Sequence, residues 1–149
     1  MSTIEKPEAL SDYPVTFTMP IQWGDQDAFG HVNNIIHIRW FESARVLYLE
    51  DSGLRLMLTD SKTGPILASI TCNYRRQLKY PDTVHIGARV SRIGRSSMTM
   101  DHAVYSQELD TIAADGSSIV VVFDYEQNRP VRVPDNIRSA IESLEGRTF

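Results

Sequence analysis

Two aspartates stand two residues apart in a short, glycine-bounded segment near the start of the chain. Asp25 and Asp27 lie within Gly24–Gly30, and a mostly apolar stretch with helical spacing follows. In an extended backbone both carboxylates would face the same way, but a turn at Ala28–Gly30 can send them in different directions. One carboxylate can therefore hold the loop while the other faces a cleft.

The position of the two carboxylates, just before a long helix, has two interpretations. In one, both aspartates accept hydrogen bonds from nearby backbone N–H groups and brace the turn. In the other, free N–H groups at the helix start near Asn33 and Asn34 stabilise negative charge that develops on a carbonyl oxygen. A carboxylate a few residues upstream could then attack that carbonyl or activate a water molecule beside it. One short segment could thus supply both halves of an acyl-transfer reaction.

The 149-residue chain has the composition of one compact domain. Its formal net charge of -4 and its lack of a long basic block argue against nucleic acid as a partner. The single Cys72 cannot form an intrachain disulfide and is interpreted as a small buried hydrophobe. No early apolar segment follows a basic start, so we expect a cytoplasmic protein. No run approaches the roughly 18 consecutive apolar residues of a spanning helix, so no membrane association is expected.

Several common catalytic and binding signatures are absent from the sequence. It contains no G-x-S-x-G nucleophile elbow, no Walker phosphate loop, no G-x-G-x-x-G, no H-E-x-x-H and no paired-cysteine metal site. His31 and His37 are separated by six positions and lack a clear third ligand. We therefore expect neither a metal site nor a cofactor.

Periodic apolar residues predict the elements that position the acidic loop. Residues 1–13 are interpreted as a flexible lead-in and residues 14–149 as a single domain. Alternation over Val15–Trp23 predicts a half-buried strand, in which Pro20 favours a sheet edge or a bulge. The helix after the loop has an apolar stripe at a 3.6-residue period and a stop signal at Asp51–Gly53. The stripe comprises Ile36, Trp40, Phe41, Ala44, Leu47 and Tyr48.

A second set of apolar residues lies on the other flank of this helix. Ile35, Ile38, Val46 and Leu49 stand there among charged residues. A helix that is apolar on two flanks should be covered on more than one side. We expect a sheet wrapped around it, with a partner subunit or a neighbouring segment covering part of the rest.

The second half of the chain predicts strands in series. A short turn at Leu54–Leu58 and a break at Thr59–Pro65 precede them. The apolar segments that follow are Ile66–Tyr74, Thr83–Val90, Met98–Val104 and Ile119–Tyr125. Helical spacing returns in Pro134–Leu144, which predicts a short peripheral helix. The order of strand, long helix and four strands is typical of an α+β fold with an antiparallel sheet.

The acidic loop and the helix together form a recognisable pattern. G-D-x-D-x-x-G-H-V-N-N, followed by an apolar helix with W-F-E-x-A-R, resembles the 4-hydroxybenzoyl-CoA thioesterase-like branch of the hotdog-fold acyl-CoA thioesterases. The resemblance covers nearly the whole chain, and Gly24–Asn34 is its specific part. It implies a hotdog fold, in which a curved antiparallel sheet of about five strands wraps a long central helix and a short C-terminal helix follows. It also implies homodimers or homotetramers with active sites at the subunit interface.

The resemblance assigns roles to individual residues. Asp27 matches the family's catalytic carboxylate, and the backbone N–H of Asn34 matches the group that polarises the thioester carbonyl. His31 would orient Asp27 or contact substrate, or else be satisfied by backbone. The candidates for substrate binding are Asn33 and, at a strand bend where the family often holds CoA phosphates, Arg92, Arg95, Ser96 and Ser97. The 4-hydroxybenzoyl enzyme has aromatic residues in place of Asn33 and Asn34, so its substrate is not implied.

Two further sets of charged residues have open interpretations. Glu42 could be catalytic, because a second hotdog branch takes its carboxylate from the long helix, but its i,i+3 spacing from Arg45 favours an ion pair. Arg75, Arg76 and Lys79 form a basic cluster that suits either phosphate binding or solvent exposure.

These observations predict hydrolysis of an acyl-CoA thioester to the free acid and CoA. The expected partners are acyl-CoA and further copies of the chain. A noncatalytic hotdog module that binds acyl-CoA is the main alternative, and a hotdog dehydratase is weaker because no matching His-plus-acid signature is evident. The acyl group, and the role of Asp27 as nucleophile or general base, are open at this stage.

Overall fold

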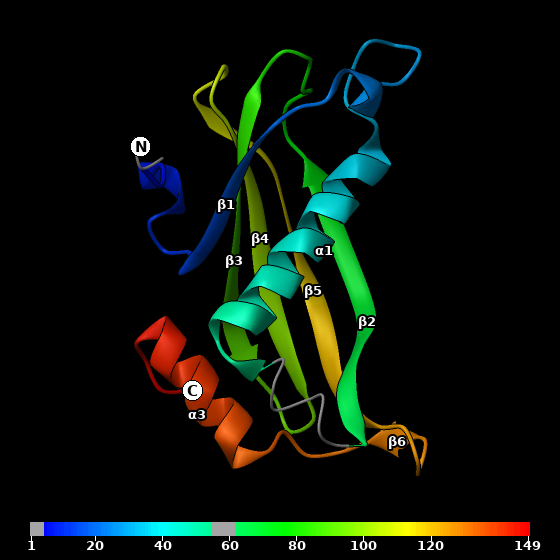
Figure 1. Ribbon diagram of the computed structural model, residues 1–149, viewed down its shortest axis with the longest axis vertical. Helices are drawn as coiled ribbons and strands as arrows, with labels where there is room; N and C mark the ends of the chain where they lie inside the picture. Colours follow the sequence, from blue (N-terminus) through cyan, green and yellow to red (C-terminus); the bar gives the residue numbers. More distant parts are fainter. Residues whose placement is uncertain (1–4, 55–61) are drawn as a thin grey trace.

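The computed structural model describes residues 5–54 and 62–149, which form an antiparallel sheet with a long helix against it (Figure 1). In chain order the elements are the 3-10 turn η1 (Glu8–Leu10), β1 (Val15–Pro20), the 3-10 turn η2 (Trp23–Asp25), α1 (Asn34–Asp51), β2 (Thr63–Tyr74), β3 (Thr83–Ile93), β4 (Ser97–Ser106), β5 (Thr111–Asp124), β6 (Arg129–Pro130) and α3 (Asp135–Glu145). The strand order is β1-β3-β4-β5-β2, with β6 beside β5. The predicted α+β hotdog architecture is confirmed.

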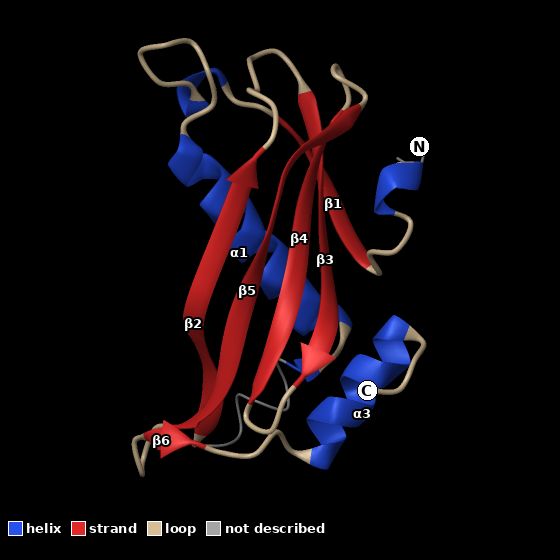
Figure 2. Ribbon diagram, turned by 180° about the vertical axis from the view of Figure 1, so that it is seen from behind, coloured by secondary structure: helices blue, strands red, loops and turns tan. Residues whose placement is uncertain are grey.

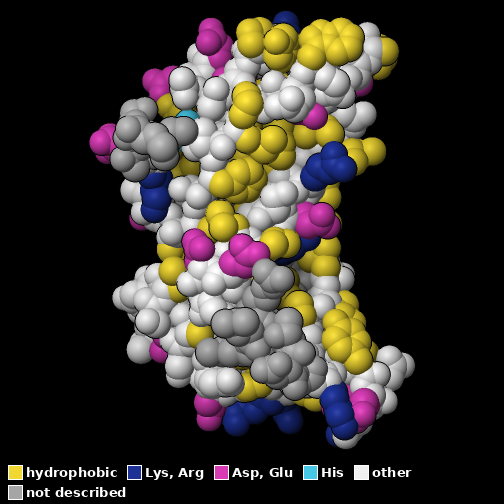
Figure 3. Space-filling model, viewed as in Figure 1, with side chains coloured by type: hydrophobic (Ala, Val, Ile, Leu, Met, Phe, Trp, Pro, Cys, Tyr) yellow, Lys and Arg dark blue, Asp and Glu magenta, His cyan; other side chains and the backbone are white. Residues whose placement is uncertain are grey.

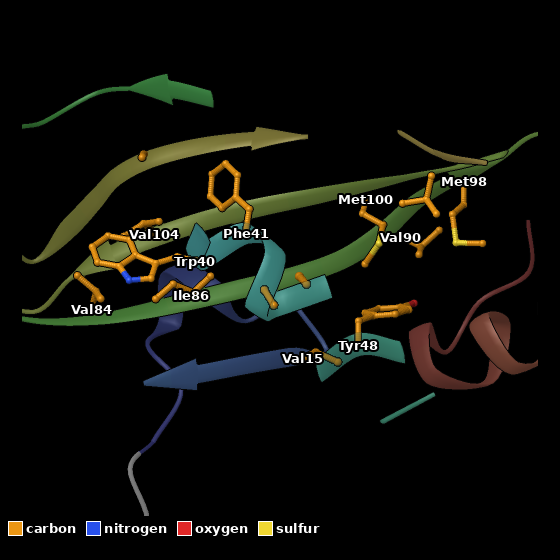
Figure 4. Close-up of a cluster of buried hydrophobic side chains, with 14 of the residues drawn as sticks. Val15, Trp40, Phe41, Tyr48, Val84, Ile86, Val90, Met98, Met100 and Val104 are labelled. Atoms are coloured by element: carbon orange, nitrogen blue, oxygen red, sulfur yellow. The ribbon is translucent and has the colours of Figure 1, made fainter. Parts of the chain in front are cut away.

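Helix α1 lies diagonally across one face of the curved sheet, and α3 packs near the far ends of α1 and β3 (Figures 1 and 2). The core lies between α1 and the sheet, where Trp40, Phe41 and Tyr48 meet aliphatic side chains from the strands (Figure 4). These strand residues include Val84, Ile86, Val90, Met98, Met100 and Val104. Removal of this continuous apolar surface from water is the main force that holds α1 on the sheet.

Local sequence signals account for both ends of α1. The Asn33 side-chain oxygen accepts the Ile35 N–H at 3.0 Å and so caps the first turn. The helix ends at Asp51, and Gly53 follows with a φ of +78°, a conformation that favours glycine. The predicted stop is therefore confirmed. The turn predicted at Leu54–Leu58 falls, after Leu54, outside the described residues.

The buried face of α1 differs in part from the predicted stripe. Its buried residues are His37, Trp40, Phe41, Ala44 and Tyr48. Ile36 and Leu47, which the period also placed there, are only half-buried. The buried face is therefore rotated slightly about the helix axis relative to the predicted stripe, toward His37.

Strand β1 is shorter than the alternation predicts. It ends at Pro20 on an edge of the sheet, which is one of the two positions expected for that proline. The turn η2 then interrupts the extended backbone and leaves Trp23 74% exposed. Upstream, Leu10 of η1 is fully buried.

Strand β2 forms the other edge and carries an irregularity. It begins at Thr63, inside the predicted break, and a bulge between Leu67 and Ser69 shifts its pairing with β5 by one residue. The predicted alternation therefore continues only from the bulge toward Tyr74. On the other side of the bulge, toward Thr63, Leu67 and Pro65 line a cavity beside α1, in place of the predicted Ile66 and Ala68.

The other predicted segments are present with small changes. β3 and β4 extend the predicted segments, and α3 matches the predicted C-terminal helix. β5 starts at Thr111, eight residues before the predicted segment, and its first half was missed because it is rich in small and polar residues. β6 was not predicted. In residues 5–54 and 62–149, no helix is both long and apolar enough to cross a membrane.

Glycine at position 116 of β5 allows two strands and the helix to come together. A Cβ there would lie 2.0 Å from the carbonyl oxygen of Thr71 and 3.0 Å from a ring carbon of Phe41. The Phe41 ring in turn stacks on His102 of β4, with ring centroids 4.8 Å apart. Only a residue without a side chain fits at this contact.

Candidate active site

A tight turn fixes the Asp27 carboxylate between η2 and α1. The Gly30 N–H donates to the Asp27 carbonyl at 3.1 Å, and Gly30 has a φ of +78°. Asp27 Oδ1 accepts the Phe29 N–H at 2.8 Å, while the Asp27 N–H donates to the His31 carbonyl at 2.8 Å. Within the described residues Oδ2 has no hydrogen-bond donor. The turn thus uses one carboxylate oxygen and leaves the other available for chemistry.

Asp25 has a bracing role in the same loop. Its Oδ2 accepts the Gln22 N–H at 2.8 Å and closes the turn η2. Its carbonyl accepts the Asn33 N–H at 2.9 Å, which ties η2 to the start of α1. The Asp25 carboxylate therefore holds the loop, whereas the Asp27 carboxylate faces a cleft.

The first turn of α1 leaves one backbone donor without an acceptor. The Ile35 N–H reaches the Asn33 side chain, and the Ile36 N–H reaches the Asn33 carbonyl at 2.9 Å. The Asn34 N–H has no hydrogen-bond acceptor in the part of the chain that the structure describes. It lies at the positive end of an 18-residue helix, where a negative oxygen would be stabilised. Asn33, predicted to bind substrate, uses its side-chain oxygen as the helix cap.

Asp27 and Asn34 line the same cleft, which has a volume of about 420 Å³. Its walls are Asp27, Phe29, His31, Val32, Asn34, His37, Tyr74, Arg75, Arg76, Gln77 and Leu78. The cleft therefore lies between the acidic loop, the start of α1 and the segment that follows β2. A carboxylate and a free N–H on one cleft suit a reaction at a carbonyl carbon.

His37 and Tyr74 belong to the cleft but were not among the predicted site residues. The Tyr74 hydroxyl donates to the Asn34 carbonyl at 2.9 Å, and the His37 ring meets the Tyr74 ring edge-on at a centroid distance of 4.9 Å. Burial raises the pKa of Tyr74 to about 12 and lowers the pKa of His37. Both side chains are thus uncharged near neutral pH. The i,i+3 spacing of His37 from Asn34 was a usable signal, whereas Tyr74 is brought in only by the tertiary fold.

His31 lines the cleft and contacts Asp27 through its main chain, by the hydrogen bond from the Asp27 N–H. The structure therefore places His31 close to Asp27, and its imidazole has no hydrogen bond to that carboxylate. Among the described residues, no group of three or more His, Cys, Asp or Glu side chains is arranged to hold a metal ion.

The basic cluster and the predicted phosphate-binding residues lie in different parts of the molecule. Arg75 and Arg76 line the cleft; Arg75 is paired with Asp115 through two hydrogen bonds of 3.1 and 3.0 Å, whereas Arg76 has no ion-pair partner in the described chain. Arg92, Arg95, Ser96 and Ser97 lie at the β3–β4 turn.

The β3–β4 turn is at the opposite end of the sheet from the cleft. Val104 and Tyr74 both pair with Ala114, so they are level with each other, and Ser97 is seven residues away along β4. At about 3.3 Å per residue this is roughly 23 Å. One protomer therefore does not bring these four residues next to Asp27.

Arg45 has a different partner from the one predicted. Its guanidinium donates to the Ser118 hydroxyl at 3.0 Å, and the Ser118 oxygen lies 2.8 Å from Nε2 of the fully buried His102. Glu42 raises the pKa of Arg45 only as a secondary influence that opposes burial. Burial, followed by the Arg45 charge, lowers the pKa of His102 to about 3. The helix thus contributes Arg45 to a polar network in which His102 is neutral, and Glu42 remains exposed.

Comparison with known proteins agrees with this architecture. A family model described as "Thioesterase-like superfamily" matches residues 21–141. A solved thioesterase from Thermus thermophilus, complexed with coenzyme A and Zn, is 30% identical and superposes with a TM-score of 0.80, covering 93% of this chain and 99% of that one. The PA5185 protein of Pseudomonas aeruginosa is 27% identical, with a TM-score of 0.77 over 91% of this chain and 94% of its own.

Similarity to curated sequences is lower or partial. YsmA of Bacillus subtilis is 30% identical over 82 residues, which are 55% of this chain and 54% of YsmA, so the match spans about half of that relative. The long-chain acyl-CoA thioesterase FadM of Escherichia coli is 22% identical over 118 residues, which are 79% of this chain and 89% of FadM.

Proposed function

Because the chain belongs to the thioesterase-like superfamily, we propose that it hydrolyses acyl-CoA thioesters to the free acid and CoA. The observation that carries this proposal is the cleft shared by the Asp27 carboxylate and the unpaired Asn34 N–H. The two groups provide what thioester hydrolysis needs: a base or nucleophile, and a donor for the carbonyl oxygen.

In the proposed reaction the thioester carbonyl oxygen accepts the Asn34 N–H, and negative charge develops on it as the carbonyl carbon is attacked. Asp27 either takes a proton from the attacking water or attacks directly to form an anhydride that water then cleaves. The C–S bond breaks in both routes, and the CoA thiolate leaves and is protonated. Tyr74 supports the oxyanion site by holding the Asn34 carbonyl.

The proposal includes a homo-oligomer, either a dimer or a tetramer. Hydrophobic side chains gather on the surface around the start of α1 (Figure 3), where Trp23, Phe29 and Ile35 are 74%, 83% and 72% exposed. Exposed apolar groups at this density favour a partner surface. A second protomer beside the cleft would complete its walls and could bring a β3–β4 turn with Arg92 and Arg95 to the CoA phosphates.

The test compares hydrolysis of an acyl-CoA panel by the wild type, Asp27→Asn and Asp25→Asn. An asparagine at either position keeps an oxygen that accepts the local N–H, so the loop should remain folded in both variants. We expect Asp27→Asn to lower kcat by about 10²–10⁴-fold and Asp25→Asn to lower it far less. Equal activity of Asp27→Asn and the wild type would reject the role of Asp27. CoA binding without turnover of any acyl group would instead support a noncatalytic module.

A further inference from the structure

A second cavity, distinct from the cleft, lies between the C-terminal half of α1 and the sheet. Its volume is about 270 Å³. Its walls are almost entirely apolar and include Val46, Leu49, Leu67, Met98, Met100 and Val120. The polar lining residues are Glu42 and Arg45, and the Arg45 guanidinium is engaged by Ser118. Here we call this cavity the apolar groove.

The groove follows from the diagonal path of α1. The helix begins close to the end of β2 and crosses toward β3, so its second half lies away from the lower parts of β2 and β5 (Figure 1). The bulge in β2 brings Leu67 to the wall opposite Val46. These two side chains are 43% and 50% exposed, so the groove is open to solvent on this side.

The second apolar flank of α1 joins the groove to the cleft. Ile35, Ile38, Val46 and Leu49 fall within a narrow sector of the helix surface, because each step of 3.6 residues completes one turn. Ile35 follows directly on Asn34, and Val46 and Leu49 line the groove. Ile70 and Cys72 of β2 pack against the core between the two cavities. The exposed Glu42 stands in the same sector between Ile38 and Val46, so the path from the oxyanion site to the groove is apolar at both ends with one carboxylate between them.

We infer that the apolar groove binds the hydrocarbon tail of a long-chain acyl-CoA. This inference rests on the proposed function for the position of the thioester. Glu42 and Leu49 are eight and fifteen residues from Asn34, or roughly 12 and 22 Å along the helix. With C–C bonds of about 1.5 Å, a zigzag chain needs about ten carbons to reach the groove and about eighteen to reach its far end.

The chemistry of the walls specifies an unsubstituted tail. Each methylene that leaves water for the groove should strengthen binding by about fourfold, which corresponds to ~0.8 kcal/mol. Apart from Glu42 and Arg45, the described lining residues have no hydrogen-bonding side chain for a polar substituent on the tail. Methionines at positions 98 and 100 provide flexible walls that adapt to the shape of the chain.

The test measures binding of uncleavable thioethers, S-octyl-CoA and S-hexadecyl-CoA, by titration calorimetry below micelle-forming concentrations. We expect the hexadecyl compound to bind the wild type at least tenfold more tightly than the octyl compound. Val46→Trp and Leu67→Trp, which would fill the groove from opposite walls, should each lower this ratio to near one. The control is Ser43→Trp on the same helix, about 100° away from Glu42 around the axis, and it should keep the wild-type ratio.

The result separates this inference from the proposed function, because the thioethers need no hydrolysis. Equal binding of the two compounds by the wild type would overturn the inference even if acyl-CoA is hydrolysed. So would an unchanged ratio in both groove-filling variants. A large ratio that only those variants lower would support it, whatever the outcome for hydrolysis.

Discussion

At the scale of single residues, Asp27 and Asn34 are positioned by separate sets of hydrogen bonds. The turn that ends at Gly30 holds Asp27. Asn33 accepts the N–H groups of the two residues after Asn34, while the N–H of Asn34 has no acceptor in the described chain. Both arrangements are built from backbone contacts and short side-chain caps. The geometry of the proposed site should therefore respond little to ionic strength, because screening acts on charges and not on these backbone contacts.

His102 makes stability depend on pH. Its ordinary pKa is 6.5, and burial lowers it to about 3 in the folded protein. Below pH 6.5 the unfolded chain therefore binds a proton that the folded protein does not. The free energy of unfolding should fall as pH drops from 6.5 toward 3, by up to about 1.4 kcal/mol per pH unit. Above pH 7 the imidazole is neutral in both states, so this loss should be absent.

Urea denaturation of the wild type and His102→Gln at pH 7.5 and pH 5 measures this effect. The wild type should lose about 2 kcal/mol more than the variant between the two values. The other groups, including His37, titrate in both proteins and cancel in the comparison. Parallel losses would show that the His102 imidazole is not the group responsible.

At the scale of elements, the approach of α1 to the sheet depends on Gly116. Gly116→Ala would force apart the Thr71 backbone and the Phe41 ring, and overpacking of this kind costs about 2 kcal/mol or more. Gly24→Ala is the matched control, because a Cβ there meets no atom within 4 Å, and it should change stability by less than about 0.5 kcal/mol. Denaturant unfolding of both variants measures the difference. Similar losses in the two would contradict the packing argument.

The elements were predictable from the sequence wherever their pattern is local. The stripe containing Trp40, Phe41 and Tyr48 has a helical period, and β1 and β3 alternate, so their types could be recognised without a partner. The β2 bulge could not, because a bulge is defined by the pairing of two strands. The apolar flank of Ile35 and Val46 indicated a covered surface without identifying what covers it.

The candidate site was predictable to the same degree. Asp27 and Asn34 are seven residues apart, so a turn and a helix start suffice to bring them to one cleft. Tyr74 is forty residues from Asn34, and only the fold joins them. The position of Arg92 and Arg95 required the strand order, which sequence periodicity does not contain.

At the scale of the whole molecule, the exposed apolar end bearing Trp23 and Phe29 predicts self-association. Light scattering coupled to gel filtration should give a mass of two or four times the 16.9 kDa of one chain. The mass should persist at high salt, because apolar contacts are not screened. A fully active species with the mass of one chain would contradict the proposed oligomer.

The two sheet edges also limit how far such an assembly can grow by strand addition. β1 is only six residues long and closes with Pro20, which lacks a backbone donor, and the twelve-residue β2 contains Pro65 and the bulge after Leu67. An uninterrupted flat edge would be a template for open-ended strand addition and fibre growth. These interruptions shorten the ladder that any incoming strand could form. The protein can thus combine exposed apolar surfaces that self-associate with resistance to amyloid-like aggregation.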